Sequence, residues 1–493
     1  MAFEKQAVIE DLLSAEGLIH LDNAGAALMP RCVLETQIEH LRLEAALGGY
    51  ESARQKHAEI EAVYESIARL INCRADEIAI VENATVGWMM AFHAIPFASG
   101  DRILTAEAEY ASNYLAYLQL VRERGVVVET IPSTADGEVC VESLKSMLDD
   151  RVKLISVTHI PTNGGLINPV EEIGAVARAN NILYLVDACQ SAGQLPLDVE
   201  TIQCDLLSAT GRKFLRGPRG VGFLFVSRRI LEDLHPPMID LFAATWIDAE
   251  HYELRPDARR FENWENNYAA KLGFGRAIDY ALDIGIDAIA AEVTRLAQKL
   301  RSMLAEQSGV TVHDIGKRKC GIVTFSIAGI AATEVESRLR QAGVNVSMSS
   351  PSSTLIDASC PNSCVPRYTT ISWIRSWSMS RNWLQLSRTR AAIKLARLDI
   401  LYRYGQHIAH LAGDRFQCIV VDGLHRRQWI DGADLNAAID LAQNHVTGQH
   451  GADFRFHADC LMGHVRIAGA EDAVGIHIDV DFLFHRRLDV DLG

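Results

Sequence analysis

Short apolar runs alternate with helix-like stretches through the first half of the chain. Strands that alternate with helical patterns build βαβ units, so this pattern predicts an α/β fold with a seven-stranded, mostly parallel sheet. The runs that we interpret as its strands are Glu77–Asn83, Arg102–Glu107, Val126–Pro132, Leu154–Ile160, Leu183–Cys189, Asp205–Thr210 and Val221–Ser227.

The next part of the chain has a different character. We expect one long helix over Asn267–Glu306, a strand over Gly321–Ser326 and an amphipathic helix near Glu334–Ala342. The pattern therefore predicts a large domain over residues 21–254. A smaller α+β domain is expected from residues 1–20 and 255–357 together.

The composition changes abruptly after about residue 358. Ser359–Arg390 is rich in serine, arginine and tryptophan, and no lysine follows Lys394. We interpret residues 358–493 as an atypical tail. It is either an added domain or a stretch that was never selected for folding.

Charge and composition narrow the partners and the compartment. The net charge of −15 over 493 residues disfavours nucleic acid and anionic membranes as partners, because both select basic surfaces. No apolar run reaches the roughly 18 residues of a membrane span, and the start of the chain lacks a signal-peptide pattern. The ten cysteines show no disulfide spacing, which predicts reduced thiols in a cytoplasmic protein.

The strongest chemical signal is an acid and a lysine that follow two of the predicted strands. Asp187 ends one apolar run, and Lys213 follows the next run after a break at Gly211. Ligands of open α/β sheets bind beyond the carboxyl ends of the strands. A lysine there can hold pyridoxal phosphate as a Schiff base, and an acid can keep its ring nitrogen protonated.

Three further segments are compatible with that cofactor, and the first two also have a plainer alternative. Ala84 and Thr85 follow a strand and open a helix, so they either bind the phosphate or simply begin the helix. Tyr110 either faces the cofactor ring or only packs. Thr162 and Asn163 lie beyond a third strand and can hydrogen-bond the cofactor or a substrate. The nearby run Gly217–Gly222 lacks a dinucleotide fingerprint and is interpreted as a structural turn.

Taken together, these motifs resemble the class V aminotransferases, which are pyridoxal phosphate enzymes of fold type I and include cysteine desulfurases and isopenicillin N epimerase-like proteins. The resemblance covers about residues 18–357. It implies that Asp187 pairs with the ring nitrogen, that Gln190 contacts the ring hydroxyl and that Lys213 carries the cofactor. It also implies that Thr210 and Arg212 lie near the phosphate, beside the Ala84–Thr85 turn.

The same resemblance implies a homodimer and an activity. Arg260–Glu265, which includes Trp264, matches a segment that reaches the partner subunit's cofactor in this family. The expected activity is transamination, epimerisation or elimination on an amino acid or a related amine. The leading alternative is a protein that binds the cofactor but is catalytically impaired, and a nucleotide-binding α/β protein is a distant third.

Two departures from the family bear on the reaction. Cysteine desulfurases carry a nucleophilic cysteine on a loop that corresponds to Val346–Thr354, and this stretch contains none. Because a thiolate is the required sulfur acceptor, desulfuration by the usual route is disfavoured. The family's ring-stacking histidine is also missing from Glu109–Asn113, which leaves the stacking residue open.

The second departure concerns the arginine that binds the substrate carboxylate in the family. Relatives carry it in a segment like Pro-x-Leu-Val-Arg-Ala-Ser-Val-His-Tyr-Tyr, where this chain reads Cys360–Ile371. A shift of one nucleotide permits the family's run at every position, with arginine spanning the codons of Cys364 and Val365. We therefore hypothesise that the chain from about residue 359 is a frame-shifted tail. In the rival reading, a real domain, His457, Asp459, Cys460 and His464 match no standard zinc spacing, so no metal is predicted.

Overall fold

The structure is a computed structural model. It describes residues 8, 10–13 and 17–349, and the backbone of the strand segments 369–372, 416–421, 427–431, 453–458, 461–470 and 473–483. The chain divides into two compact units, residues 1–387 and 388–493. The predicted boundaries at residues 254 and 357 stay predictions.

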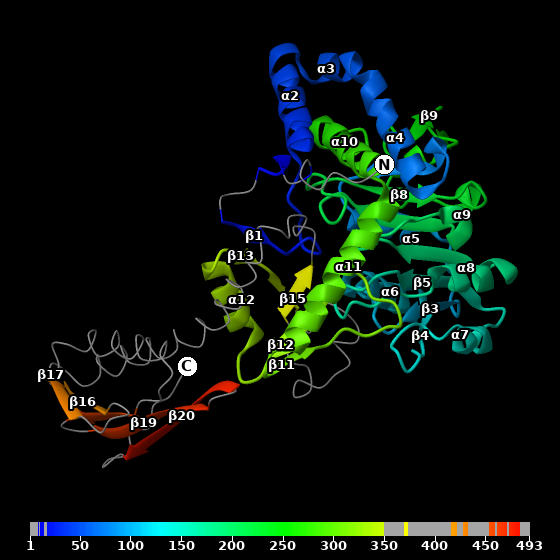
Figure 1. The fold of residues 1–493 in the computed structure, drawn as a ribbon. Helices are drawn as coiled ribbons and strands as arrows, with labels where there is room; N and C mark the ends of the chain where they lie inside the picture. The colour runs from blue at the N-terminus through cyan, green and yellow to red at the C-terminus, as the bar shows by residue number, and fades with distance from the viewer. Residues whose placement is uncertain are drawn as a thin grey trace. The chain divides into compact units, whose positions relative to one another are not determined.

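A seven-stranded sheet forms the centre of the first unit, as the alternating pattern predicts (Figure 1). Its strand order is β2-β8-β7-β6-β5-β3-β4, and only β8 runs antiparallel to its neighbours. The strands are β2 (Ile78–Val81), β3 (Arg102–Ala106), β4 (Val127–Ile131), β5 (Val152–Thr158), β6 (Leu183–Asp187), β7 (Leu206–Thr210) and β8 (Gly222–Val226).

Helices cover both faces of this sheet, because successive strand residues point to opposite sides. Leu185 and Leu206 pack into one hydrophobic cluster with Trp88, whereas their neighbours Val186 and Leu207 pack into another cluster. The first part of the chain contributes α2 (Arg31–Leu47), α3 (Gly49–Gln55), α4 (His57–Ile71), α5 (Ala84–Ala94), α6 (Ala111–Arg124), α7 (Val141–Met147), α8 (Val170–Ala179) and α9 (Val199–Ile202).

The single long helix predicted over Asn267–Glu306 is wrong. The structure has two helices, α10 (Tyr268–Ile284) and α11 (Ile286–Ala305), with Gly285 between them. Gly285 adopts φ +94°, a conformation that glycine reaches without strain and that ends a right-handed helix. Apolar periodicity continues through both helices, so the pattern alone hid the break.

A second sheet is formed by β11 (Val310–Val312), β12 (Ile322–Ile327), β15 (Thr369–Ser372) and β14 (Ser347–Met348), which pair antiparallel in the order β11-β12-β15-β14. Helix α12 (Ala332–Gln341) and α11 pack their apolar residues with those of β12. Strand β1 (Ile19–His20) pairs parallel with β13 (Val344–Asn345), so the N-terminal segment is tied to this part of the chain. A hairpin of β9 (Ala244–Trp246) and β10 (Tyr252–Leu254) completes the unit.

The second unit contains a five-stranded antiparallel sheet in the order β17-β16-β18-β19-β20. Its strands are β16 (Phe416–Val421), β17 (Arg427–Asp431), β18 (Asp453–Ala458), β19 (Leu461–Ala470) and β20 (Ala473–Leu483). The side chains weighed above as metal ligands lie outside the described residues, as does most of Cys360–Ile371. Of the helices that the structure describes, none has both the length and the hydrophobicity of a membrane span.

Candidate active site

Asp187 and Lys213 are brought together at the carboxyl edge of the central sheet. Asp187 is the last residue of β6 and pairs with Thr158 of β5 and Ser208 of β7. Lys213 lies in the connection from β7 to β8, which closes through a hydrogen bond of 3.0 Å from Gly211 N to Val221 O. Both side chains are buried, with 5% and 9% of their surface exposed. The sheet topology therefore places an acid and an amine in one buried region.

The surroundings of Lys213 favour a reactive amine. Burial lowers the pKa of Lys213, whereas nearby Cys189 and Asp187 act in the opposite direction. The described contacts of Lys213 include no hydrogen bond or ion pair of its amine. A buried amine with a lowered pKa is more often neutral and nucleophilic, as covalent attachment of an aldehyde requires.

Polar atoms without partners surround this pair. The side-chain Nε2 of Gln190 donates to Ala24 O at 3.2 Å, but its Oε1 is buried without a hydrogen-bond partner. Nδ2 of Asn23, the residue before Ala24, is also buried and unpaired. Buried polar groups are nearly always satisfied, so such atoms indicate a missing ligand. Together with Asp187 and Lys213, they fit a ring that carries a basic nitrogen, a hydroxyl and an aldehyde.

A helix start at the end of β2 is suited to hold a phosphate. Asn83 caps α5 by accepting a hydrogen bond of 3.0 Å from Val86 N, and Thr85 is exposed beside it. Ala84 is buried against Gly222, where a Cβ would lie 3.2 Å from Ala84 N. The N–H groups and the positive end of the helix dipole favour an anion at this position.

The remaining predicted residues lie around the same edge or apart from it. Thr210 is the buried last residue of β7, and half-buried Arg212 contributes to the electrostatic environment of Lys213. Asn163 accepts a hydrogen bond of 2.6 Å from Ser349 Oγ and lies next to half-buried Thr162. Tyr110 directly precedes helix α6. The positions of these residues do not establish what each side chain binds, so their roles in cofactor binding stay predictions.

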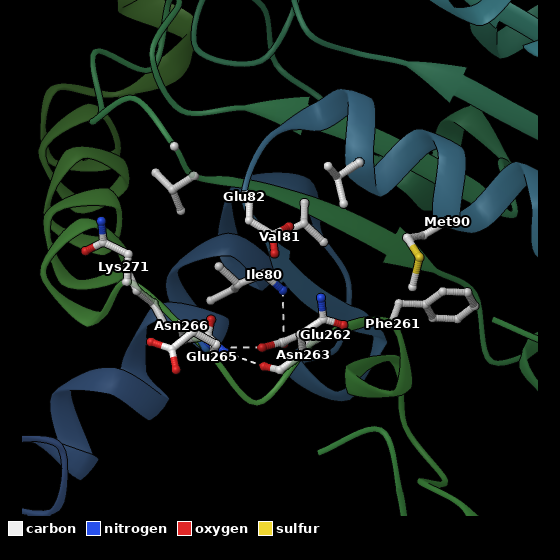
Figure 2. A pocket seen from close by; sticks show the side chains of 14 residues that line it. Ile80, Val81, Glu82, Met90, Phe261, Glu262, Asn263, Glu265, Asn266 and Lys271 are labelled. Atoms are coloured by element: carbon white, nitrogen blue, oxygen red, sulfur yellow. Dashed lines mark hydrogen bonds and ion pairs between the residues drawn. The ribbon is translucent and has the colours of Figure 1, made fainter. Parts of the chain in front are cut away.

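Trp264 lies in a different setting. Its side chain is 53% exposed, and its backbone N–H donates to Asp240 Oδ2 at 2.6 Å. The pocket of Figure 2 is bounded by Val81 and Glu82 on one side and by the neighbours of Trp264, from Phe261 to Asn267, on another. Neither Lys213 nor Asp187 lines it. The segment around Trp264 is thus presented at the surface, next to the start of α5.

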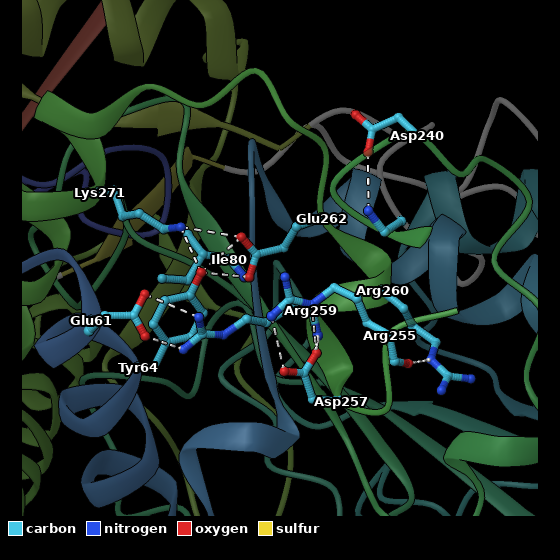
Figure 3. A network of polar contacts seen from close by, with 11 residues as sticks. Glu61, Tyr64, Ile80, Asp240, Arg255, Asp257, Arg259, Arg260, Glu262 and Lys271 are labelled. Carbon is cyan, nitrogen blue, oxygen red and sulfur yellow. Dashed lines mark hydrogen bonds and ion pairs between the residues drawn. The ribbon is translucent and has the colours of Figure 1, made fainter. Parts of the chain in front are cut away.

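A buried polar network anchors that segment (Figure 3). Glu262 accepts hydrogen bonds from Tyr64 Oη at 2.8 Å, from Ile80 N at 3.0 Å and from Lys271 Nζ at 3.2 Å. The guanidinium of Arg259 lies 3.8 Å from the centroid of the Tyr64 ring and pairs with Glu61. Sequence reasoning missed this network, because most of its contacts join residues far apart in the chain.

Sequence reasoning also missed a second acid close to Asp187. Glu109 is fully buried, and Asn113 Nδ2 donates to Glu109 Oε1 at 2.9 Å and to Asp187 Oδ2 at 3.0 Å. The signal was present, since Glu109 directly precedes Tyr110 after a buried strand.

Comparisons with known proteins identify the family of the chain. A family model described as Aminotransferase class-V matches residues 19–359. A probable cysteine desulfurase of Methanothermobacter thermautotrophicus is 29% identical over 312 residues, which cover 63% of this chain and 78% of the relative. A cysteine desulfurase of Yersinia pestis is 28% identical over 350 residues, covering 68% and 84%.

Solved structures share the fold. The cysteine desulfurase of Thermococcus onnurineus superposes with a TM-score of 0.72 at 23% identity, covering 80% of this chain and 99% of that one. The cystine C–S lyase C-DES, in complex with cysteine persulfide, gives 0.68 at 19% identity, covering 77% and 98%. The match to the family model and the site described above lead to one conclusion: the chain belongs to the class-V aminotransferase family of enzymes, and its cofactor is pyridoxal 5′-phosphate.

Proposed function

We propose that the protein is a pyridoxal phosphate-dependent lyase that breaks the carbon–sulfur bond of cysteine or cystine by elimination. The observation that carries the proposal is the buried placement of Lys213 and Asp187 at one sheet edge, next to unpaired polar atoms. When bound, the cofactor supplies an electron sink for the carbanion at the substrate's α-carbon.

Each of the six site residues has a specific role in this proposal. Lys213 holds the cofactor covalently and moves the proton of the substrate's α-carbon, a task suited to an amine with a lowered pKa. Asp187 accepts the hydrogen bond of the protonated ring nitrogen. Gln190 Oε1 accepts a hydrogen bond from the ring hydroxyl. Thr85, Thr210 and Arg212 bind the phosphate together with the N–H groups at the start of α5.

The choice of elimination rests on the small-domain loop and on the relatives. Relatives named cysteine desulfurases favour a sulfur-containing amino acid as substrate. The loop that carries the nucleophilic cysteine in desulfurases corresponds to Val346–Thr354 in this chain, and this stretch contains no cysteine. Without a thiolate to accept sulfur, the sulfur leaves with the departing group.

The test compares the products formed by the protein loaded with pyridoxal phosphate. Elimination from cysteine or cystine yields pyruvate and ammonia, whereas transfer of sulfur to an enzyme thiol yields alanine. We expect pyruvate, together with a visible absorbance band that is lost in Lys213→Ala. Alanine as the sole product would overturn the elimination, and a wild type that stays colourless in excess cofactor would overturn the whole site.

A second candidate function is a protein that binds the cofactor but turns over amino acids poorly. Its support is that the family match ends at residue 359, where the hypothesised frame shift removes the carboxylate-binding arginine. In this case the protein is coloured, but no amino acid changes its spectrum. A chain expressed from a gene with the frame restored then responds to amino acids, whereas a sequence change of equal length elsewhere in the tail has no effect.

We also propose that the protein acts as a homodimer. The supporting observation is a set of large apolar side chains exposed close to the 260–265 segment in sequence. They are Met238, Leu241, Trp246, Ile247, Tyr252 and Trp264. Light scattering after size-exclusion chromatography is expected to give twice the mass of the chain, and Trp246→Asp to give the monomer. Leu118→Asp, on the exposed side of α6, is the matched control.

A further inference from the structure

The first observation concerns the contacts of Glu109, which lies directly after the strand and turn that precede α6. Its side chain is fully buried and accepts hydrogen bonds from five donors, with no cation among them. Oε1 accepts from Tyr110 N, Asn113 Nδ2 and Thr158 Oγ1, and Oε2 accepts from Thr105 Oγ1 and Thr158 N. Removing a carboxyl group from water costs free energy, so its complete burial without a cation points to a role beyond packing.

The second observation is that one amide nitrogen joins two acids. Asn113 Nδ2 carries two hydrogens, one for Glu109 Oε1 at 2.9 Å and one for Asp187 Oδ2 at 3.0 Å. The other oxygen of Asp187, Oδ1, accepts a hydrogen bond of 2.9 Å from Cys189 N. Both oxygens of Asp187 therefore accept a hydrogen bond. One of the two donors, Asn113 Nδ2, is itself oriented by its second hydrogen bond, to Glu109.

The third observation is the charge balance around these groups. Asp187 from β6 acts on the charge state of Glu109, while Lys213 and Cys189 lie near Asp187. Burial and the charge of Glu109 raise the pKa of Tyr117 on α6, so Tyr117 stays neutral and contributes no charge. Burial raises the pKa of Glu109 to about 7, and the charge of Asp187 acts in the same direction. The charge states of the two acids are thus coupled across Asn113.

We propose that Glu109 is a positioning residue for Asp187, which it orients through the shared amide of Asn113 so that Asp187 holds the proton of the cofactor's ring nitrogen. This inference rests on the proposed role of Asp187 and extends it by one further acid. A negative charge behind Asp187 makes Asp187 a better acceptor, and the fixed amide prevents its carboxylate from turning away. Glu109 itself does not touch the cofactor.

The test is a pH titration of the visible absorbance of the loaded protein, for which no turnover is needed. In Glu109→Gln the midpoint is expected to move by about 0.5 pH unit or more, because the charge that acts on Asp187 is lost. Asn113→Ala keeps both acids but removes the bridge, and it is expected to move the midpoint as well. Because alanine suits a helix, Asn113→Ala keeps the test decisive if Glu109→Gln fails to fold.

The matched control is Tyr117→Phe, one turn further along α6. It removes a buried hydroxyl that donates to Ser156 Oγ at 2.8 Å and leaves the Asn113 bridge intact. Its midpoint is expected to equal that of the wild type. Unchanged midpoints in both Glu109→Gln and Asn113→Ala, or an equal shift in Tyr117→Phe, would overturn the role of Glu109 alone. A wild type without a visible band would instead overturn the proposed function, and this inference with it.

Discussion

Lys271 and Glu262 form an ion pair inside the protein, with 4% and 0% of their side-chain surfaces exposed and 3.2 Å between Nζ and Oε2. The pair fixes the start of α10 to the segment that presents Trp264. The hydroxyl of Tyr64 contacts both partners, at 2.7 Å from Lys271 and 2.8 Å from Glu262. Charges in such a place are stable only while all their partners remain.

The first prediction concerns this pair. Lys271→Met leaves the Glu262 carboxylate buried without its cation, so we expect the free energy of unfolding to fall by about 3 kcal/mol or more. Arg54→Met is the control, because it breaks an exposed pair with Glu51 and is expected to cost less than about 1 kcal/mol. Urea unfolding of the two variants checks the difference, and equal losses would contradict the structural role of the buried pair.

The second prediction concerns Gly193, in the turn after Gln190. Its φ is +90°, and a Cβ there would lie 2.6 Å from Leu215 N, in the backbone that follows Lys213. Gly193→Ala is expected to lower the free energy of unfolding by about 3 kcal/mol or more, from strained φ and overlap together.

Gly220 offers the matched comparison. Its φ is +76°, but a Cβ there meets no atom within 4 Å, so Gly220→Ala is expected to cost only about 1 kcal/mol. Thermal unfolding of both variants measures the overlap by difference. If Gly193→Ala lowered the free energy of unfolding no more than Gly220→Ala, the close approach of Gly193 to the backbone of Leu215 would be wrong.

The third prediction tests the proposed phosphate site at the start of α5. Thr85→Ala is expected to raise the dissociation constant of pyridoxal phosphate about tenfold, the value of one charge-assisted hydrogen bond. Because Thr85 is exposed, the unloaded protein should unfold within about 0.5 kcal/mol of the wild type. Thr294→Ala, at an exposed position of α11, is the control and should leave cofactor affinity unchanged. Equal affinities of all three proteins would remove Thr85 from the site.

The fourth prediction is a pH dependence of stability in the unloaded protein. The pKa of Glu109 is about 7 in the folded chain, above its usual 4.5, so the folded state binds the proton more tightly. The resulting stabilisation is fully present below pH 4.5 and is lost as the pH rises through about 7. Between these limits the wild type is expected to lose about 3 kcal/mol more than Glu109→Gln.

Urea unfolding at a series of pH values measures this difference. Burial lowers the pKa of His159 to about 4, so its contribution has the opposite sign and is lost as the pH falls from about 6.5. Because both proteins contain His159, its effect cancels in the comparison. Parallel stability profiles of wild type and Glu109→Gln would show that Glu109 does not titrate in this range.

The sequence predicted the central sheet well, because each strand carries its own local pattern. The run Leu183–Cys189, for example, contains β6 with two extra residues at its end. Local pattern failed at Gly285, where backbone conformation rather than hydrophobicity ends a helix. It also failed for the contact of Glu109 with Thr158 on β5 and for the partners of Glu262 on α4 and β2. Such contacts depend on three-dimensional packing that no local window contains.

The connection that carries Lys213 joins two strands that are neighbours both in sequence and in the sheet, β7 and β8. A hairpin of this kind closes a short loop, whereas each parallel pair of the sheet must wait for a crossover helix. The turn around Lys213 can therefore form early in folding, before the distant segments that contain Asn23 and Asn113 reach it. Chain ends moved elsewhere by circular permutation would leave this turn intact.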